Sequence, residues 1–145
     1  MIRGTTASFK FELPHKLKYI RSAKVAFWQE GYEGVPSASS PLIIPYKPIP
    51  IGDPMGEKKE LIVVLTPDQT MQFTDKAKLR VQMRAINDAY DDVKPASFGS
   101  RTELFNVYPI IGGINDDMFP EDLPTSGGYI ILSGDVVNTD GAGVD

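Results

Sequence analysis

The feature that most constrains this chain is a strict alternation of apolar and polar side chains in two separate segments. The apolar positions are Ala7, Phe9, Phe11 and Leu13 in the first segment, and Ala77, Leu79, Val81, Met83 and Ala85 in the second. A period of two places every second side chain on one face of a β-strand, so each segment is predicted to bury one face. Residues 23–29 and the apolar run 61–65 also have strand length. The alternation therefore predicts sheets with one solvated side.

Local signals end and connect these strands. Pro14 ends the first strand, and residues 16–22 are predicted to form a short connection with one helical turn. Residues 66–69 read Thr-Pro-Asp-Gln, which puts a hydroxyl at the N-cap, proline at the first helical position and glutamine at the third. This arrangement predicts a short helix that Phe73 closes against the core.

The later part of the strand pattern predicts a hairpin, with its loop at residues 87–93 and its return strand at residues 102–111. Five strands, with as many as two more between residues 30 and 60, are joined without the long helical crossovers of parallel sheets. This organisation predicts an all-β fold, a small antiparallel immunoglobulin-like β-sandwich over residues 1–111. The Cys…Trp…Cys pattern of antibody domains is absent.

A proline-rich stretch interrupts the predicted sandwich at about residues 30–60. Five of the twelve prolines lie between Pro41 and Pro54, which leaves too few free amides for a central strand and favours an extended course. Its apolar side chains need cover, so we expect a long loop that lies flat on its own domain or on a partner. The candidate partner contacts here are Leu42, Ile43, Ile44, Tyr46, Ile49 and Ile51.

The last 34 residues, 112–145, contain seven acidic residues and no basic one, whereas residues 1–29 carry a net charge of +5. These charges would attract each other within a chain or between neighbours, unless both are simply solvated. We expect an extended C-terminal arm that docks along a surface, including by strand addition, or a last strand that completes its own sheet. The candidate contacts in this arm are Met118, Phe119, Leu123, Tyr129, Ile130, Ile131 and Leu132.

Residues that carry most enzyme chemistry are absent or scattered. With no cysteine and one histidine, the chain lacks a thiol nucleophile, a disulfide, a cysteine-ligated metal and a histidine-rich metal centre. The acidic clusters at 88–92 and 116–122 do not match a calcium-loop spacing. His15 has no G-x-S-x-G nucleophile to serve and is expected at the surface. We predict no catalytic residue, no cofactor and no metal.

Nucleic acid and membranes are not expected partners. The net charge is −4, and the basic face formed by Lys78, Arg80 and Arg84 has no interleaved aromatic residues, so it is better explained as the solvated side of a sheet. No apolar window approaches the roughly 18–20 residues of a membrane span, and no signal-peptide core is present. The sequence predicts a protein that stays in a cytosol or is assembled from there.

The first fourteen residues, MIRGTTASFKFELP, resemble a family of small proteins encoded in tailed-bacteriophage genomes and prophages, which begins MIRGTTP followed by alternating apolar residues and LP. The similarity covers most of residues 1–119 and continues through 24–29, 65–70 with Phe73, 79–84 and the Asn-Asp-Asp-Met of 115–118. Ala7 departs from the family's proline, 30–60 looks like an insertion, and 120–145 looks like an extension. The resemblance implies a phage context and supplies no catalytic residues.

These observations predict a non-enzymatic bacteriophage virion structural protein. It would be a homo-oligomer or a multicopy component of a symmetric assembly, in contact with capsid, portal, neck or tail subunits. A decoration, collar or fibre-anchoring subunit of the head or neck is favoured over a tail or baseplate component. The alternative is a carbohydrate- or host-surface-binding module that uses Trp28, Tyr32, Tyr46 and Tyr90. The expected location is the virion, assembled in the cytoplasm of a bacterial host.

Overall fold

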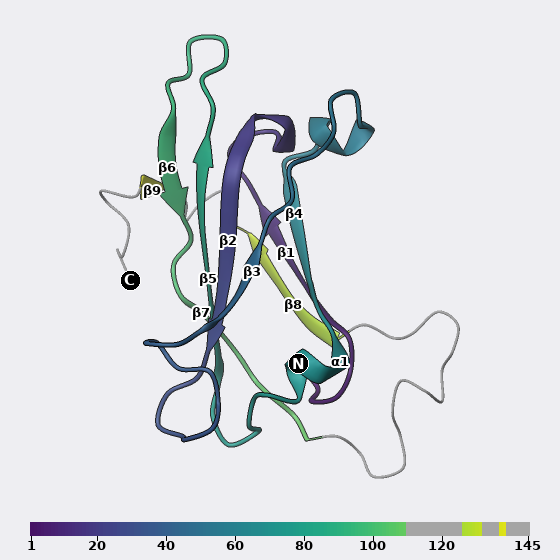
Figure 1. The fold of residues 1–145 in the computed structure, drawn as a ribbon, viewed down its shortest axis with the longest axis vertical. Coiled ribbons are helices and arrows are strands. Elements are labelled where there is room, and N and C mark those ends of the chain that lie inside the picture. Colours follow the sequence, from purple (N-terminus) through teal and green to yellow (C-terminus); the bar gives the residue numbers. More distant parts are fainter. Residues whose placement is uncertain (110–125, 132–136, 139–145) are drawn as a thin grey trace.

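The computed structural model describes residues 1–109, 126–131 and 137–138. Two β-sheets face each other across one hydrophobic core (Figure 1). The larger sheet has the order β3–β2–β5–β6–β9, with β7 also paired to β5, and the smaller sheet has the order β4–β1–β8. The all-β expectation is confirmed.

The bounds of the elements follow the sequence patterns in part: β2 begins at Ile20, inside the connection predicted at residues 16–22. The larger sheet comprises β2 (Ile20–Trp28), β3 (Leu42–Pro45), β5 (Leu79–Asn87), β6 (Ala96–Gly99), β7 (Glu103–Phe105) and β9 (Val137–Asn138). The smaller sheet comprises β1 (Ala7–Glu12), β4 (Glu60–Leu65) and β8 (Ser126–Ile131). Three short helices connect them: η1 (Leu17–Tyr19), η2 (Pro54–Glu57) and α1 (Pro67–Thr70).

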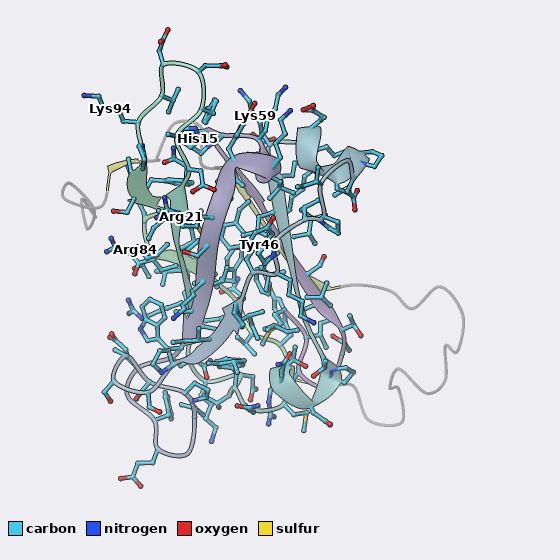
Figure 2. All side chains as sticks on the ribbon, turned by 45° about the horizontal axis from the view of Figure 1, so that its top comes forward. His15, Arg21, Tyr46, Lys59, Arg84 and Lys94 are labelled. Atoms are coloured by element: carbon cyan, nitrogen blue, oxygen red, sulfur yellow. The ribbon has the colours of Figure 1, made fainter. Side chains whose placement is uncertain are left out.

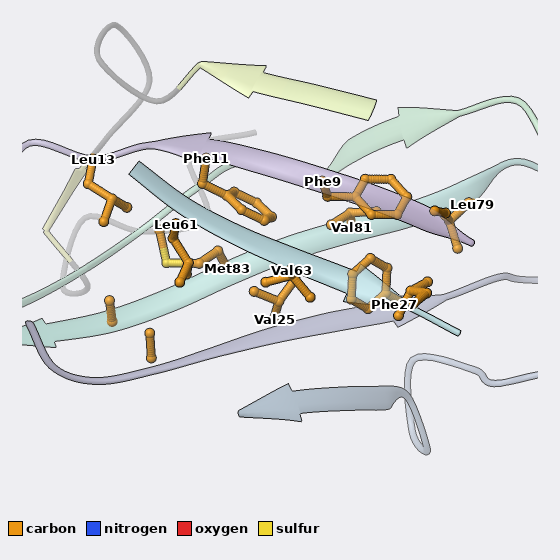
Figure 3. Close-up of a cluster of buried hydrophobic side chains, with 14 of the residues drawn as sticks. Phe9, Phe11, Leu13, Val25, Phe27, Leu61, Val63, Leu79, Val81 and Met83 are labelled. Carbon is orange, nitrogen blue, oxygen red and sulfur yellow. The ribbon is translucent and has the colours of Figure 1, made fainter. Parts of the chain in front are cut away.

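The alternating segments supply the core between the sheets, as predicted (Figure 3). Phe9 in β1 has no exposed surface, and its ring centroid lies 5.1 Å from that of Phe27 in β2 and 5.3 Å from that of Phe105 in β7. One side chain of the smaller sheet thus contacts two strands of the larger one. Burial of such a ring stabilises the fold by about 1.5–3 kcal/mol.

The short helix predicted after β4 is also confirmed. The Thr66 Oγ1 accepts a hydrogen bond from the Gln69 backbone N–H at 3.2 Å, and the Gln69 Oε1 accepts one from the Thr66 backbone N–H at 2.9 Å. Two N–H groups that the helix leaves unpaired are therefore satisfied by side chains. Phe73 is buried behind α1, as expected.

The return strand of the hairpin was predicted at the wrong place. It begins at Ala96 rather than at residue 102 and is split into β6 and β7. Ser100 lies at the break, where its backbone N–H donates to the Met83 carbonyl and its Oγ accepts from the Met83 N–H, both at 2.9 Å. The Ser100 hydroxyl takes the place of a backbone carbonyl as the acceptor for Met83, at the point where the hydrogen-bond ladder between β5 and the return strand is interrupted. Residues 110 and 111 lie outside the described residues.

One strand pair departs from the predicted antiparallel arrangement. β8 pairs with β1 in parallel, with Ala7 opposite Ser126 and Glu12 opposite Ile131, whereas every other pair of named strands is antiparallel. A parallel pair needs a long connection, and the whole chain between β1 and β8 supplies it. β8 and β9 belong to the predicted C-terminal arm, and both pair with strands of their own chain.

Candidate functional site

The proline-rich segment separates into a part that packs on the core and a part that does not. Leu42, Ile44, Tyr46 and Ile49 are partly buried against the hydrophobic core, and β3 forms an edge of the larger sheet. Ile43 is 48% exposed and Ile51 is fully exposed, at 107% of its reference surface. Ile51 is therefore the candidate contact in this segment that the fold itself does not cover.

A tight turn holds Ile51 in this position. The Asp53 backbone N–H donates to the Pro50 carbonyl at 3.1 Å, and Gly52 has a φ of +87°. A positive φ at the third position alone defines a type II turn, which favours glycine there because other side chains are strained. Ile51 occupies the second position, so its side chain points into solvent from a fixed backbone.

A helix cap and two ion pairs link the turn to the connection between β1 and β2. The Asp53 Oδ1 accepts from the Met55 N–H at 2.9 Å and caps η2. The Glu57 carboxylate at the end of η2 lies 2.9 Å from the Lys18 Nζ and 3.1 Å from the Lys16 Nζ. The hydrogen bond from Lys18 lowers the pKa of Glu57, and the same bond raises the pKa of Lys18.

A cavity of about 470 Å³ opens beside the turn. Its walls are formed by residues 49–54 of the turn, by Gly56 and Glu57 of η2, and by Lys18 and Tyr19 of η1. A Cβ at Gly56 would lie 3.2 Å from the Lys18 Cβ, so η2 packs closely against η1. An exposed isoleucine next to an open cavity suits contact with the side chains of a protein partner.

His15 is not the surface residue that we expected. It is partly buried, its Nδ1 lies 2.7 Å from the Tyr90 Oη, and its ring lies 5.3 Å from that of Phe98. Tyr90 in turn stacks on Tyr19 with centroids 3.7 Å apart. Burial, and then the charge of Lys59, lower the pKa of His15 (Figure 2). The histidine thus joins the η1 connection to the β5–β6 hairpin. No local sequence pattern predicts this contact.

The aromatic residues considered for ligand stacking do not gather on one surface. Trp28 pairs with Arg80 at one end of β5, and Tyr90 follows the other end of β5. Seven strand residues separate these ends, roughly 24 Å. Tyr32 is 44% exposed, and Tyr46 is partly buried with its Oη accepting from the Ile49 N–H at 3.1 Å.

The candidate contacts of the C-terminal arm fall into two groups. Tyr129, Ile130 and Ile131 lie in β8, opposite Lys10, Phe11 and Glu12 of β1. The remaining candidates, Met118, Phe119, Leu123 and Leu132, lie outside the described residues.

Across residues 1–109 and the described strands β8 and β9, no cluster of three or more metal-binding side chains occurs. In that same part of the chain, no helix is both long and apolar enough to cross a membrane.

Comparisons of this chain with protein-family models, with curated proteins and with solved structures found no match.

Proposed function

We propose that this protein is a non-enzymatic bacteriophage virion structural protein that binds neighbouring virion proteins through the turn at Ile51. The proposal includes an immunoglobulin-like form of the sandwich, a multicopy arrangement, and a place on the head or neck as a decoration, collar or fibre-anchoring subunit. The phage context comes from the N-terminal sequence resemblance. The observation that supports a contact with neighbouring virion proteins is the full exposure of Ile51 on a hydrogen-bonded turn.

The energetics of Ile51 support an assembly contact. Burying an isoleucine stabilises a complex by about 1.5–3 kcal/mol, and this residue keeps all of that surface in solvent. The hydrogen bond within the turn and the ion pairs at Glu57 order the segment before any partner arrives. A pre-ordered anchor loses little conformational entropy on binding, which is the property expected of a hot spot.

The test is incorporation into particles of the phage or prophage that encodes the chain. Ile51→Ser is compared with Met71→Ser, which changes a 45% exposed side chain just after α1. We expect Ile51→Ser to lower the copy number in purified particles at least about tenfold, because each assembly contact loses its apolar anchor. Met71→Ser should leave the copy number unchanged, and both variants should keep the wild-type melting temperature.

Quantitative mass spectrometry of the particles gives the result. Absence of the wild-type chain from particles would refute the virion role. Wild-type incorporation of Ile51→Ser would refute the contact. A copy number that matches tail or baseplate symmetry would move the protein from the head or neck to the tail.

A further inference from the structure

A second surface, on the outer face of the larger sheet, has the chemistry of a binding groove. A cavity of about 490 Å³ lies over β2, β5 and β6. Lys24 of β2 and Arg84 of β5 lie directly opposite each other in the ladder and both line it. The other lining residues are small, hydroxyl-bearing or apolar: Ser22, Ala23, Ala85, Ile86 and Ser97. The lining includes no carboxylate.

Gly99 makes room for the Arg84 side chain. The two residues are opposite each other in the β5–β6 ladder. A Cβ at Gly99 would lie 2.8 Å from the Arg84 Cδ and 2.7 Å from the Met83 carbonyl oxygen, closer than real contacts allow. Arg84 therefore lies across β6 at a point where only glycine fits, and it projects from the sheet on the side away from β1 and β4 (Figure 2).

The two cations lack a counter-charge in the described part of the chain. Like charges at directly opposite positions of an antiparallel pair destabilise the sheet. On the same face, Arg80 lies 3.6 Å from Glu30, but neither Lys24 nor Arg84 has an ion pair with any described residue. An anion in the groove would remove this repulsion and gain two charge-assisted hydrogen bonds.

We propose that the groove binds an acidic peptide segment, supplied by residues 112–125 of a second copy of this chain. That stretch has four acidic residues and no basic one, so its charge complements the groove. It also carries apolar residues between its acids, which suit the 37% exposed Ile86. Nucleic acid fits less well, because a phosphate backbone needs a longer row of free cations than two.

Within one chain, the acidic residues at 116–122 differ in how far they can reach. Ser126 lies opposite Ala7 at the start of β1, and Glu121 lies five residues before it, so Glu121 and Asp122 stay within about 18 Å of Ser126. A second copy has no such limit and can present all four acids to the groove together. The contact would be head-to-tail between copies, and it does not depend on a virion role.

Exchange of the charges between two full-length variants tests the proposal. The groove variant carries Lys24→Glu and Arg84→Glu, and the segment variant carries Asp116→Lys, Asp117→Lys, Glu121→Lys and Asp122→Lys. Sedimentation velocity at about 50 mM salt should show concentration-dependent association of the wild-type chain that disappears at about 500 mM, because salt screens exposed charges. Each variant alone should associate at least about tenfold more weakly, since like charges now meet.

An equimolar mixture of the two variants should associate again, because each copy then offers the charge that the other lacks. The matched control carries Lys47→Glu and Lys76→Glu, the same charge change at exposed positions outside the groove, and should associate like the wild type. A wild-type chain that stays monomeric at low salt would overturn the proposal. So would a mixture that fails to associate, or a control that dissociates like the groove variant.

Discussion

At the scale of single residues, Gln29 shows how a buried polar group fastens distant parts of the chain. Its side chain is fully buried at the end of β2. The Nε2 donates to the carbonyls of Thr74 and Ala77 at 2.7 and 2.9 Å, and the Oε1 accepts from the Thr74 N–H at 2.8 Å. A buried amide of this kind stabilises the fold only while all of its bonds are made.

Replacement of Gln29 by methionine keeps its length but leaves one N–H and two carbonyls of residues 74 and 77 without a partner. We expect the free energy of unfolding to fall by on the order of 2–4 kcal/mol, because unpaired buried groups keep their desolvation cost. Urea denaturation measures the loss. The control is Gln82→Met, which removes one bond of 3.2 Å from a partly exposed side chain and should cost under about 1 kcal/mol. Equal losses in both variants would contradict this account.

Residues whose partners are close in sequence could be predicted, and residues with distant partners could not. The capping pair Thr66 and Gln69 is three positions apart, so the motif itself predicts the contact. Gln29 bonds a residue 45 positions away, and His15 bonds one 75 positions away. Nothing local in either sequence context marks these contacts, because their partners are brought close only by the packing of the sheets.

At the scale of elements, the contact of His15 with Tyr90 joins the β1–β2 connection to the β5–β6 hairpin. Burial and the nearby Lys59 lower the folded-state pKa of His15 below its usual value near 6.5. The unfolded chain therefore binds a proton at a pH where the folded chain does not. Stability from this group is fully present above pH 6.5 and falls as the pH drops from there toward the folded-state pKa.

Thermal melting between pH 7.5 and 5.5 should show this loss in the wild-type chain and not in His15→Phe. His15 is the single histidine of the sequence, and most carboxylates titrate below this range. The pKa of the terminal amine of Met1 is also lowered by burial, but its contribution is common to both proteins and cancels in the difference. Parallel melting curves for the two proteins across this range would contradict the assignment.

The elements themselves were predicted where a periodic pattern alone determines them. β1, β4 and β5 follow from alternation or an apolar run. β3 was not placed within the proline-rich stretch, because its pairing with β2 depends on a partner and not on its own period. The break between β6 and β7 was missed for a similar reason, since Ser100 acts through a bond to Met83 on the neighbouring strand.

At the scale of the whole molecule, the smaller sheet is assembled from three distant parts of the sequence. β1, β4 and β8 come from its start, middle and end, and β1 lies in the centre. The sequence predicted a strand near residues 129–132 and left open whether it would pair within the chain. Its parallel register on β1 could not be predicted, because the period of two is the same in parallel and antiparallel strands.

A chain that ends at residue 109 should therefore be less stable than the full chain. β1 would become an edge strand, and each interstrand hydrogen bond lost removes about 0.5–1.5 kcal/mol. We expect a lower urea midpoint and more aggregation on refolding, because a long exposed edge recruits other strands. A chain that ends at Asn138 keeps β8 and β9 and serves as the control. An unchanged midpoint after truncation at 109 would show that β8 does not support the sheet.

The pairing of β1 with β8 also sets the order of events during synthesis. β1 leaves the ribosome while its parallel partner, roughly 120 positions later, has not yet been translated. The backbone groups on one side of β1 therefore stay unpaired until residues 126–131 have been made. The nascent chain is exposed to mispairing for that whole interval, so slow translation or crowded polysomes would reduce its yield more than that of a protein whose neighbouring strands are made together.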